Sequence, residues 1–223
     1  MVKGTSMQAE HSEHILRGIA EVRSIRDKLF TVMQEVLAAD NKALYPLDLI
    51  TLLVAKRTVS TISAFSSLIE QHNMVCVRTL LRTQLDSMMR LYAFSLVDDP
   101  HNIAVEVLGG THIRKIRDRT GNLLTDAYLV NKLSKDIEWL PRVYERTSGF
   151  IHLSDRLVGM TMKAEESGKL SVVLSDTDDM PEVSWEEVIK CFLHASHVLL
   201  HLLDTWADRK NEVAALRQIR TNN

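Results

Sequence analysis

The sequence predicts an all-α fold, a single-domain antiparallel bundle of about six to seven helices. Apolar residues recur at intervals of three and four almost throughout the chain, which is the spacing of one face of a helix. Only 8 Gly and 4 Pro interrupt 223 residues, so the helices are expected to be long. The chain has no Pro/Gly/Ser-rich linker and no charge block. This favours one domain over 1–223, with its helical core at about 12–208.

Three long helices are expected in the first half of the chain, at about 12–38, 46–71 and 73–97. The apolar stripe of the first is Ile15, Ile19, Val22, Ile25, Leu29, Val32 and Val36. The turn ADNKALYP separates it from the second helix, which begins at Pro46. Apolar residues surround the third helix on every side, so we expect it to lie in the centre of the bundle.

The second half is expected to hold shorter helices and one irregular insert. These helices are expected at about 100–119, 123–139 and 141–167. The first of them is interrupted at Gly109-Gly110. The segment 168–183 contains KLSVVLSD and is predicted to be an irregular or strand-like insert. Ser184 and Glu187 form a capping-box pattern, which predicts the start of a last helix running to about 208.

Composition and charge narrow the classes of function. The net charge of -2 does not indicate a nucleic-acid or acidic-membrane partner for the molecule as a whole. The run from Leu47 to Ala55 is too short to span a bilayer, and the N-terminal residues lack the apolar core of a signal peptide. We therefore expect a cytoplasmic protein with no membrane partner. Cys76 and Cys191 lie in apolar helical patterns and are expected to be buried thiols in a reducing compartment.

A charged stripe crosses the third helix, although this helix is expected to be buried. Arg78, Arg82 and Asp86 recur every four residues, so they lie on one side of it, and Arg82 and Asp86 can form an ion pair. A buried charge is costly unless it is paired and hydrogen-bonded. The stripe is therefore either a structural ion pair that fixes helix register or the wall of a charged site.

The sixth expected helix carries a matching polar stripe in YERTSGFIHLSD. Tyr144, Ser148 and His152 lie within about 80° of arc on a helical wheel. Gly149 lies beside them, and a glycine inside a helix often permits the close approach of a neighbour. Our hypothesis is that this stripe meets Arg82 and Asp86.

These stretches resemble known helical families. RTSGFIH, with Arg146 and His152, resembles the R-x4-6-H motif of the HEPN superfamily of helical nucleotide-binding and ribonuclease domains. VRTLLRTQLD followed by YERTSGFIH is similar to a family of uncharacterised bacterial proteins that pair an Arg-x-x-x-acid helix with a Tyr-x-x-x-Ser-x-x-x-His helix. The resemblance covers about Ala43 to Leu203. It implies a metal-independent ribonuclease or a nucleotide- or RNA-binding protein, in a stress or phage-defence system.

The resemblance also implies roles for four residues. His152 would be the acid/base, Arg146 would stabilise the charge that develops on the phosphate, and Tyr144 and Ser148 would orient the histidine or bind phosphate. Histidine titrates near neutral pH, and a guanidinium binds phosphate at two points. A net rotation of about 240° separates Arg146 from His152 on a straight helix, so the two do not share a face. A kink at Gly149 or a partner subunit must bring them together, and a homo-oligomer is expected.

Two further clusters are candidate sites. HIRKIRDR is a candidate phosphate-binding segment through Arg114, Lys115, Arg117 and Arg119. Its alternative is a solvated helix face, because no aromatic residues interleave for base stacking. The last helix carries His194, His197 and His201, which could bind a metal. Their stripe lies opposite the apolar face, so the alternative is a solvated or partner-facing surface.

Three functions therefore stay open. The first is a HEPN-like protein with RNA or a nucleotide as partner, and the second is a non-catalytic helical binding or scaffold protein whose polar seam is structural. The third is a metal-binding bundle. No cofactor is expected, because the sequence has no P-loop, dinucleotide fingerprint or serine-hydrolase elbow. A catalytic stripe should lie open in a basic cleft, whereas a structural seam should be closed with its polar atoms paired.

Overall fold

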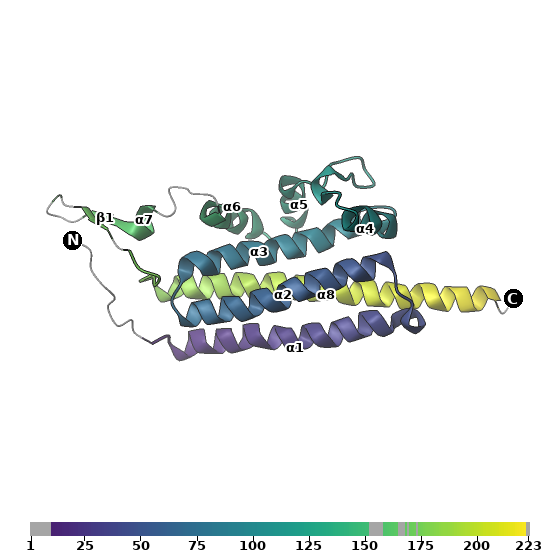
Figure 1. Ribbon diagram of the computed structural model, residues 1–223, viewed down its shortest axis with the longest axis horizontal. Coiled ribbons are helices and arrows are strands. Elements are labelled where there is room, and N and C mark those ends of the chain that lie inside the picture. Colours follow the sequence, from purple (N-terminus) through teal and green to yellow (C-terminus); the bar gives the residue numbers. More distant parts are fainter. Residues whose placement is uncertain (1–9, 152–157, 165–167, 169, 173, 222–223) are drawn as a thin grey trace.

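The computed structural model describes residues 10–151, 158–164, 168, 170–172 and 174–221, which form a packed helical bundle (Figure 1). The prediction of an all-α fold in one packed body is confirmed. In chain order the elements are α1 (Glu13–Lys42), α2 (Pro46–Glu70), α3 (Met74–Ala93), η1 (Phe94–Leu96), α4 (Pro100–Leu108), η2 (Ile113–Lys115), α5 (Asp126–Leu133), α6 (Leu140–Ile151), α7 (Val158–Thr161), β1 (Met162–Ala164), β2 (Leu170–Val172) and α8 (Glu182–Thr221).

The first helices begin where the sequence predicts, because their N-terminal caps are local. The backbone N–H of Ile15 donates to the Ser12 side chain at the start of α1, and that of Cys76 donates to the Asn73 side chain at the start of α3. Asp99 accepts from two backbone N–H groups at the start of α4. Each cap satisfies donors that the helix itself leaves unpaired. Within α1 the backbone leaves helical geometry at Ala39, so the regular part matches the predicted 12–38.

The predicted helix over 100–119 is wrong in its second half. The helix ends at Leu108, and Gly110 turns the chain with a φ of +100° that favours glycine. A loop closed by Asp118 follows, since the Asp118 carboxylate accepts from the backbone N–H groups of Thr120 and Asn122. An aspartate side chain that accepts hydrogen bonds from backbone N–H groups a few residues later in the chain competes with helix formation.

Later boundaries also differ from the predictions. Thr125 rather than Asn122 caps α5, which ends at Leu133 instead of about 139. Residues 162–164 are not helical as predicted but form β1, which pairs antiparallel with β2 inside the predicted insert. α8 begins at Glu182, two residues before the predicted cap at Ser184, and continues to Thr221.

The long helices form the body of the bundle, and α4, α5 and α6 lie along one side of it (Figure 1); α5 and α6 pack against α3, and α4 packs against α2. α2 runs antiparallel to both of its sequence neighbours, while α1 and α8 run in the same direction. Gly18 of α1 allows α1 and α8 to approach closely, because a Cβ at this position would lie 3.0 Å from the side chain of Ile189 in α8. α3 packs against α2, α6 and α8, which confirms its predicted central place.

A buried ion pair fixes α8 against the turn between α1 and α2. The Lys210 ammonium and Asp48 are 1% and 0% exposed and lie 3.0 Å apart. Lys210 also donates to the carbonyl oxygens of Val36 and Ala43, and Trp206 donates to the other carboxylate oxygen of Asp48. These bonds satisfy all three ammonium donors, which a buried charge requires.

Cys191 is buried as predicted, whereas Cys76 is exposed, and both thiols are free. Burial raises the pKa of Cys191 to about 12. α2 is long and apolar enough to cross a membrane by length and composition, but half of its most apolar window is buried in the bundle. A core helix of a soluble protein meets the same criterion.

Candidate functional site

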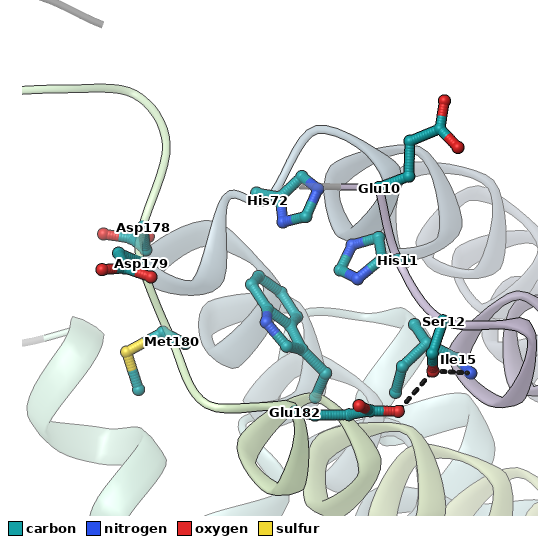
Figure 2. A pocket seen from close by; sticks show the side chains of 10 residues that line it. Glu10, His11, Ser12, Ile15, His72, Asp178, Asp179, Met180 and Glu182 are labelled. Carbon is teal, nitrogen blue, oxygen red and sulfur yellow. Dashed lines mark hydrogen bonds between the residues drawn. The ribbon is translucent and has the colours of Figure 1, made fainter. Parts of the chain in front are cut away.

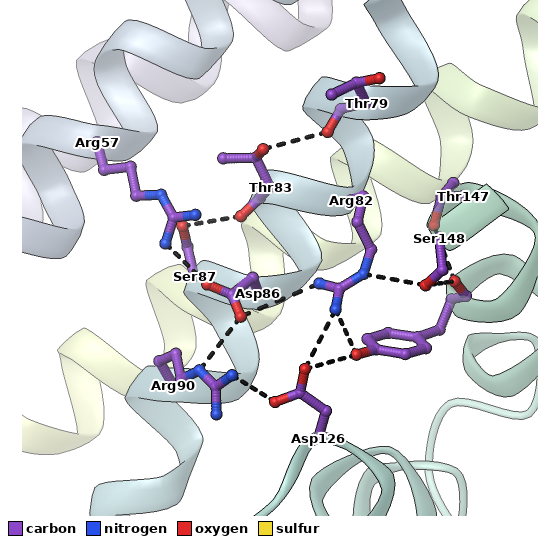
Figure 3. Close-up of polar contacts among 11 residues, drawn as sticks. Arg57, Thr79, Arg82, Thr83, Asp86, Ser87, Arg90, Asp126, Thr147 and Ser148 are labelled. Carbon is purple, nitrogen blue, oxygen red and sulfur yellow. Dashed lines mark hydrogen bonds and ion pairs between the residues drawn. The ribbon is translucent and has the colours of Figure 1, made fainter. Parts of the chain in front are cut away.

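Arg82 of α3 is the centre of a polar network between α3, α5 and α6 (Figure 3). Its side chain is almost buried and lies with its guanidinium carbon 3.8 Å from the centre of the Tyr144 ring. It donates to the Tyr144 hydroxyl and, over 3.4 Å, to the Ser148 hydroxyl. The expected meeting of the two stripes is therefore observed for Tyr144 and Ser148. His152, the third member of its stripe, lies outside the described residues.

Two carboxylates complete the network. Asp126, at the start of α5, accepts from the Tyr144 hydroxyl over 2.7 Å and from the guanidinium groups of Arg82 and Arg90. Asp86 lies 4.0 Å from Arg82 and 3.2 Å from Arg90. The sequence-predicted pair of Arg82 and Asp86 is thus present, but each residue has closer partners.

Arg57 of α2 adds a third guanidinium, 2.9 Å from Asp86. The network therefore holds three guanidinium groups (Arg57, Arg82 and Arg90) and two carboxylates (Asp86 and Asp126), and its formal charge is +3 − 2 = +1. One guanidinium nitrogen, Nη1 of Arg90, is buried and has no hydrogen-bond partner among the described residues.

The network holds its acids and bases in fixed charge states. Burial and the hydrogen bond to Asp126 raise the pKa of Tyr144 to about 12. Burial alone would raise the pKa of Asp126, but the hydrogen bond from Tyr144 and the charges of Arg90 and Arg82 outweigh it and lower that pKa. At neutral pH Tyr144 is a protonated donor and Asp126 a charged acceptor. Neither group is tuned to exchange a proton near neutral pH, as a general acid or base would be.

Arg146 and Arg78 take other partners. Arg146 does not hydrogen-bond to Tyr144 or Ser148 through its guanidinium but forms an ion pair of 3.2 Å with Glu187 of α8. Arg78 lies with its guanidinium 4.8 Å from the centre of the Phe150 ring. The described residues therefore bring Tyr144, Ser148 and Arg82 together and direct Arg146 elsewhere.

The four basic residues after α4 divide into two pairs. Arg117 donates to the carbonyl oxygen of Gly121, and Arg119 donates to the carbonyl oxygens of Ser95, Leu96 and Val97. These two side chains hold their loop in place and are not the solvated helix face that was the alternative. Arg114 and Lys115 are exposed, and their side chains have no hydrogen bond or ion pair to any residue that the structure describes.

The histidines of α8 are exposed, in agreement with their predicted place opposite the apolar face. His194 accepts a hydrogen bond from the Trp139 indole over 3.0 Å. In the described part of the chain, no three His, Cys, Asp or Glu side chains are grouped so that they could hold a metal ion. The arrangement does not favour the metal-binding function.

A second polar pocket, of about 210 Å³, lies where the start of α1 meets the turn between α2 and α3 (Figure 2). His11 and His72 stack with their ring centres 3.8 Å apart, and Trp185 meets both rings edge-on. His11 contacts the Ile69 carbonyl oxygen at 2.7 Å, and the His72 carbonyl accepts from the Asp178 N–H. Burial, followed by the charge of His11, lowers the pKa of His72. Residues from three segments of the chain line this pocket: the start of α1, the turn between α2 and α3, and the residues around the start of α8.

Three members of the Arg82 network were not predicted from the sequence: Arg57, Arg90 and Asp126. Arg90 continues the predicted stripe at the next interval of four, so its spacing was a usable signal. Arg57 and Asp126 come from other helices, and no local pattern indicates their contacts with α3.

Comparison with known proteins adds no relative: no protein-family model matches the chain, and no curated protein or solved structure matches it.

Proposed function

We propose that the protein is a non-catalytic helical binding protein that associates with a second copy of itself, and that the Arg82 network is a structural seam of its bundle. The observation that carries this proposal is the closure of the network around Arg82. Arg82 is 9% exposed, and its donors meet Tyr144, Ser148 and Asp126. A site for RNA cleavage needs an open face where a phosphate can reach the guanidinium.

The charge states support the same conclusion. The pKa of Tyr144 is raised to about 12 and that of Asp126 is lowered. At neutral pH the two side chains therefore form a hydrogen bond and do not act as a general acid or base. Arg146, which the HEPN resemblance pairs with His152, forms an ion pair with Glu187, a carboxylate that it shares with Arg142. Ribonuclease activity depends on His152, which lies outside the described residues, and it stays a prediction of the resemblance.

The proposed binding surface is the C-terminal end of α8, which extends past the turn between α1 and α2 (Figure 1). Leu216 and Ile219 are 61% and 59% exposed there, and Val213 is also exposed. Spaced every three residues, these three lie along one side of the helix. An apolar stripe on a projecting helix is typical of a surface that another helix covers.

A second copy fits this surface because the stripe is symmetric about Leu216. In an antiparallel pair of α8 ends, Leu216 faces the partner subunit's Leu216, and Val213 faces the partner's Ile219. Such a self-complementary contact closes with twofold symmetry. The small net charge of -2 does not oppose the association of two copies.

The mass of the protein in solution tests this proposal. By light scattering after gel filtration we expect a dimer for the wild type, a monomer for Leu216→Lys and a dimer for the matched control Gln218→Lys. The control must lie away from the whole stripe: Gln218 is exposed and lies about 160° from Leu216 and about 100° or more from Val213 and Ile219 around the helix. A wild-type monomer at micromolar concentration, or a dimer that Leu216→Lys leaves intact, would overturn the proposed surface.

A further inference from the structure

A cleft of about 600 Å³ lies beside the Arg82 network, between α3 and the turn that follows α4. Its lining residues are Arg90, Val107, Gly110, Thr111, His112, Ile113 and Arg114. No acidic side chain is among them, although the chain has 29 acidic residues. We propose that this cleft binds a small phosphate monoester, with the phosphate between Arg90 and Arg114.

The charge of the surrounding residues favours a dianion. The network to which Arg90 belongs has a formal charge of +1, because its three guanidinium groups meet only two carboxylates. Arg114 adds one more positive charge at the cleft, for which no described residue supplies a counter-ion. The sum is +2. A phosphate monoester carries a charge of about −1.5 to −2 at neutral pH, so it matches this excess, whereas a carboxylate neutralises half of it.

The hydrogen-bonding capacity of Arg90 points to the same ligand. Arg90 uses two of its nitrogens for Asp86 and Asp126 (Figure 3). Its Nη1 is buried without an acceptor among the described residues, which is an unfavourable state for a guanidinium N–H. Arg90 also lines the cleft, so a small rotation of the guanidinium would let a phosphate oxygen accept from it. Arginine binds phosphate oxygens through such geometry.

The remaining walls define the rest of the ligand. Thr111 and His112 offer a hydroxyl and an imidazole beside Arg114. Val107 and Ile113 form an apolar side, so the group esterified to the phosphate is expected to be apolar. A volume of about 600 Å³ suits a small organic molecule better than a bare phosphate ion.

Calorimetric titration with phenyl phosphate, and with phenol as the neutral match, tests the proposal. We expect saturable binding of phenyl phosphate and none of phenol. Arg114→Gln should weaken the affinity for phenyl phosphate by about tenfold or more, the loss typical of a charge-assisted hydrogen bond. Arg114 is exposed and has no partner among the described residues, so this change leaves the fold intact.

The matched control is Lys115→Gln. It also removes one positive charge, but from the next residue in the chain, whose side chain does not line the cleft. It should leave the affinity for phenyl phosphate within about twofold of the wild type, because an exposed charge outside the cleft is screened by solvent and salt. Equal losses in the two variants, or no saturable binding at millimolar concentration, would overturn the proposal. Self-association is measured separately and does not depend on this cleft, so either proposal can fail alone.

Discussion

The Tyr144 phenol donates a hydrogen bond of 2.7 Å to the Asp126 carboxylate, joining α6 to the start of α5. Burial raises the pKa of Tyr144, and this bond raises it further, while the same bond helps to lower the pKa of Asp126 against the effect of burial. Arg82 contacts both groups and links them to α3. Three helices therefore depend on one contact, and its loss should be measurable as a loss of stability.

Tyr144→Phe should lower the free energy of unfolding by about 1–3 kcal/mol, since the charged Asp126 carboxylate and the Arg82 guanidinium each lose one hydrogen-bond partner. The ring remains, so the stacking against Arg82 is kept. Urea denaturation gives this value. Tyr92→Phe is the matched control, because the Tyr92 hydroxyl has no hydrogen bond among the described residues, and it should change stability by less than about 0.5 kcal/mol.

Asp126→Asn should cost about 1–3 kcal/mol, because it leaves three guanidinium groups against one carboxylate. Arg57→Gln removes the most exposed cation of the network and relieves part of its excess charge. It should cost at most about 1 kcal/mol, as exposed ion pairs do. Thermal and urea unfolding of the two variants would show this order. The reverse order would mean that the network is not held by its carboxylates.

Lys210→Met should be among the most destabilising single changes, with a loss of about 3–5 kcal/mol. It leaves the buried carboxylate of Asp48 without its cation, which is the costly way to break a buried pair. Lys190→Met removes an exposed i,i+4 partner of Glu186 from the same helix and should cost less than about 1 kcal/mol. Chemical denaturation of both variants makes the comparison, and similar losses would contradict the anchoring role of Lys210.

His72→Asn should reduce the loss of stability at acid pH. The folded protein holds the pKa of His72 below its usual value of 6.5. As the pH falls below about 6.5, the unfolded chain therefore binds more protons at this residue, and stability decreases. Asn suits the positive φ of 56° at this position. Melting temperatures measured from neutral to acid pH should fall less steeply in His72→Asn than in the wild type, and equal slopes would contradict the contribution of His72.

The helices of the first half were predictable because their signals are local. Ser12, Asn73 and Asp99 cap helices through bonds to residues two or three positions ahead. The loop after Gly110 was not predictable in the same way. Its basic residues follow a helical spacing, but the carboxylate of Asp118 and the contacts of Arg119 with the distant carbonyls at 95–97 hold it in another shape.

The candidate site was predictable only in part. The stripes that contain Arg82, Tyr144 and Ser148 follow from spacing, and their meeting follows from the need to pair a buried charge. The partners Asp126 and Arg57 depend on how α5 and α2 pack against α3, which no local pattern specifies. The pairing of Lys210 with Asp48 joins residues 162 positions apart for the same reason.

The most direct test of the structural seam is RNA cleavage by the purified wild-type protein beside His152→Ala, with EDTA present. We expect that neither protein cleaves RNA above the level of a buffer control. Cleavage by the wild type that His152→Ala abolishes, while the variant unfolds at the wild-type temperature, would contradict this expectation and establish metal-independent ribonuclease chemistry at this stripe.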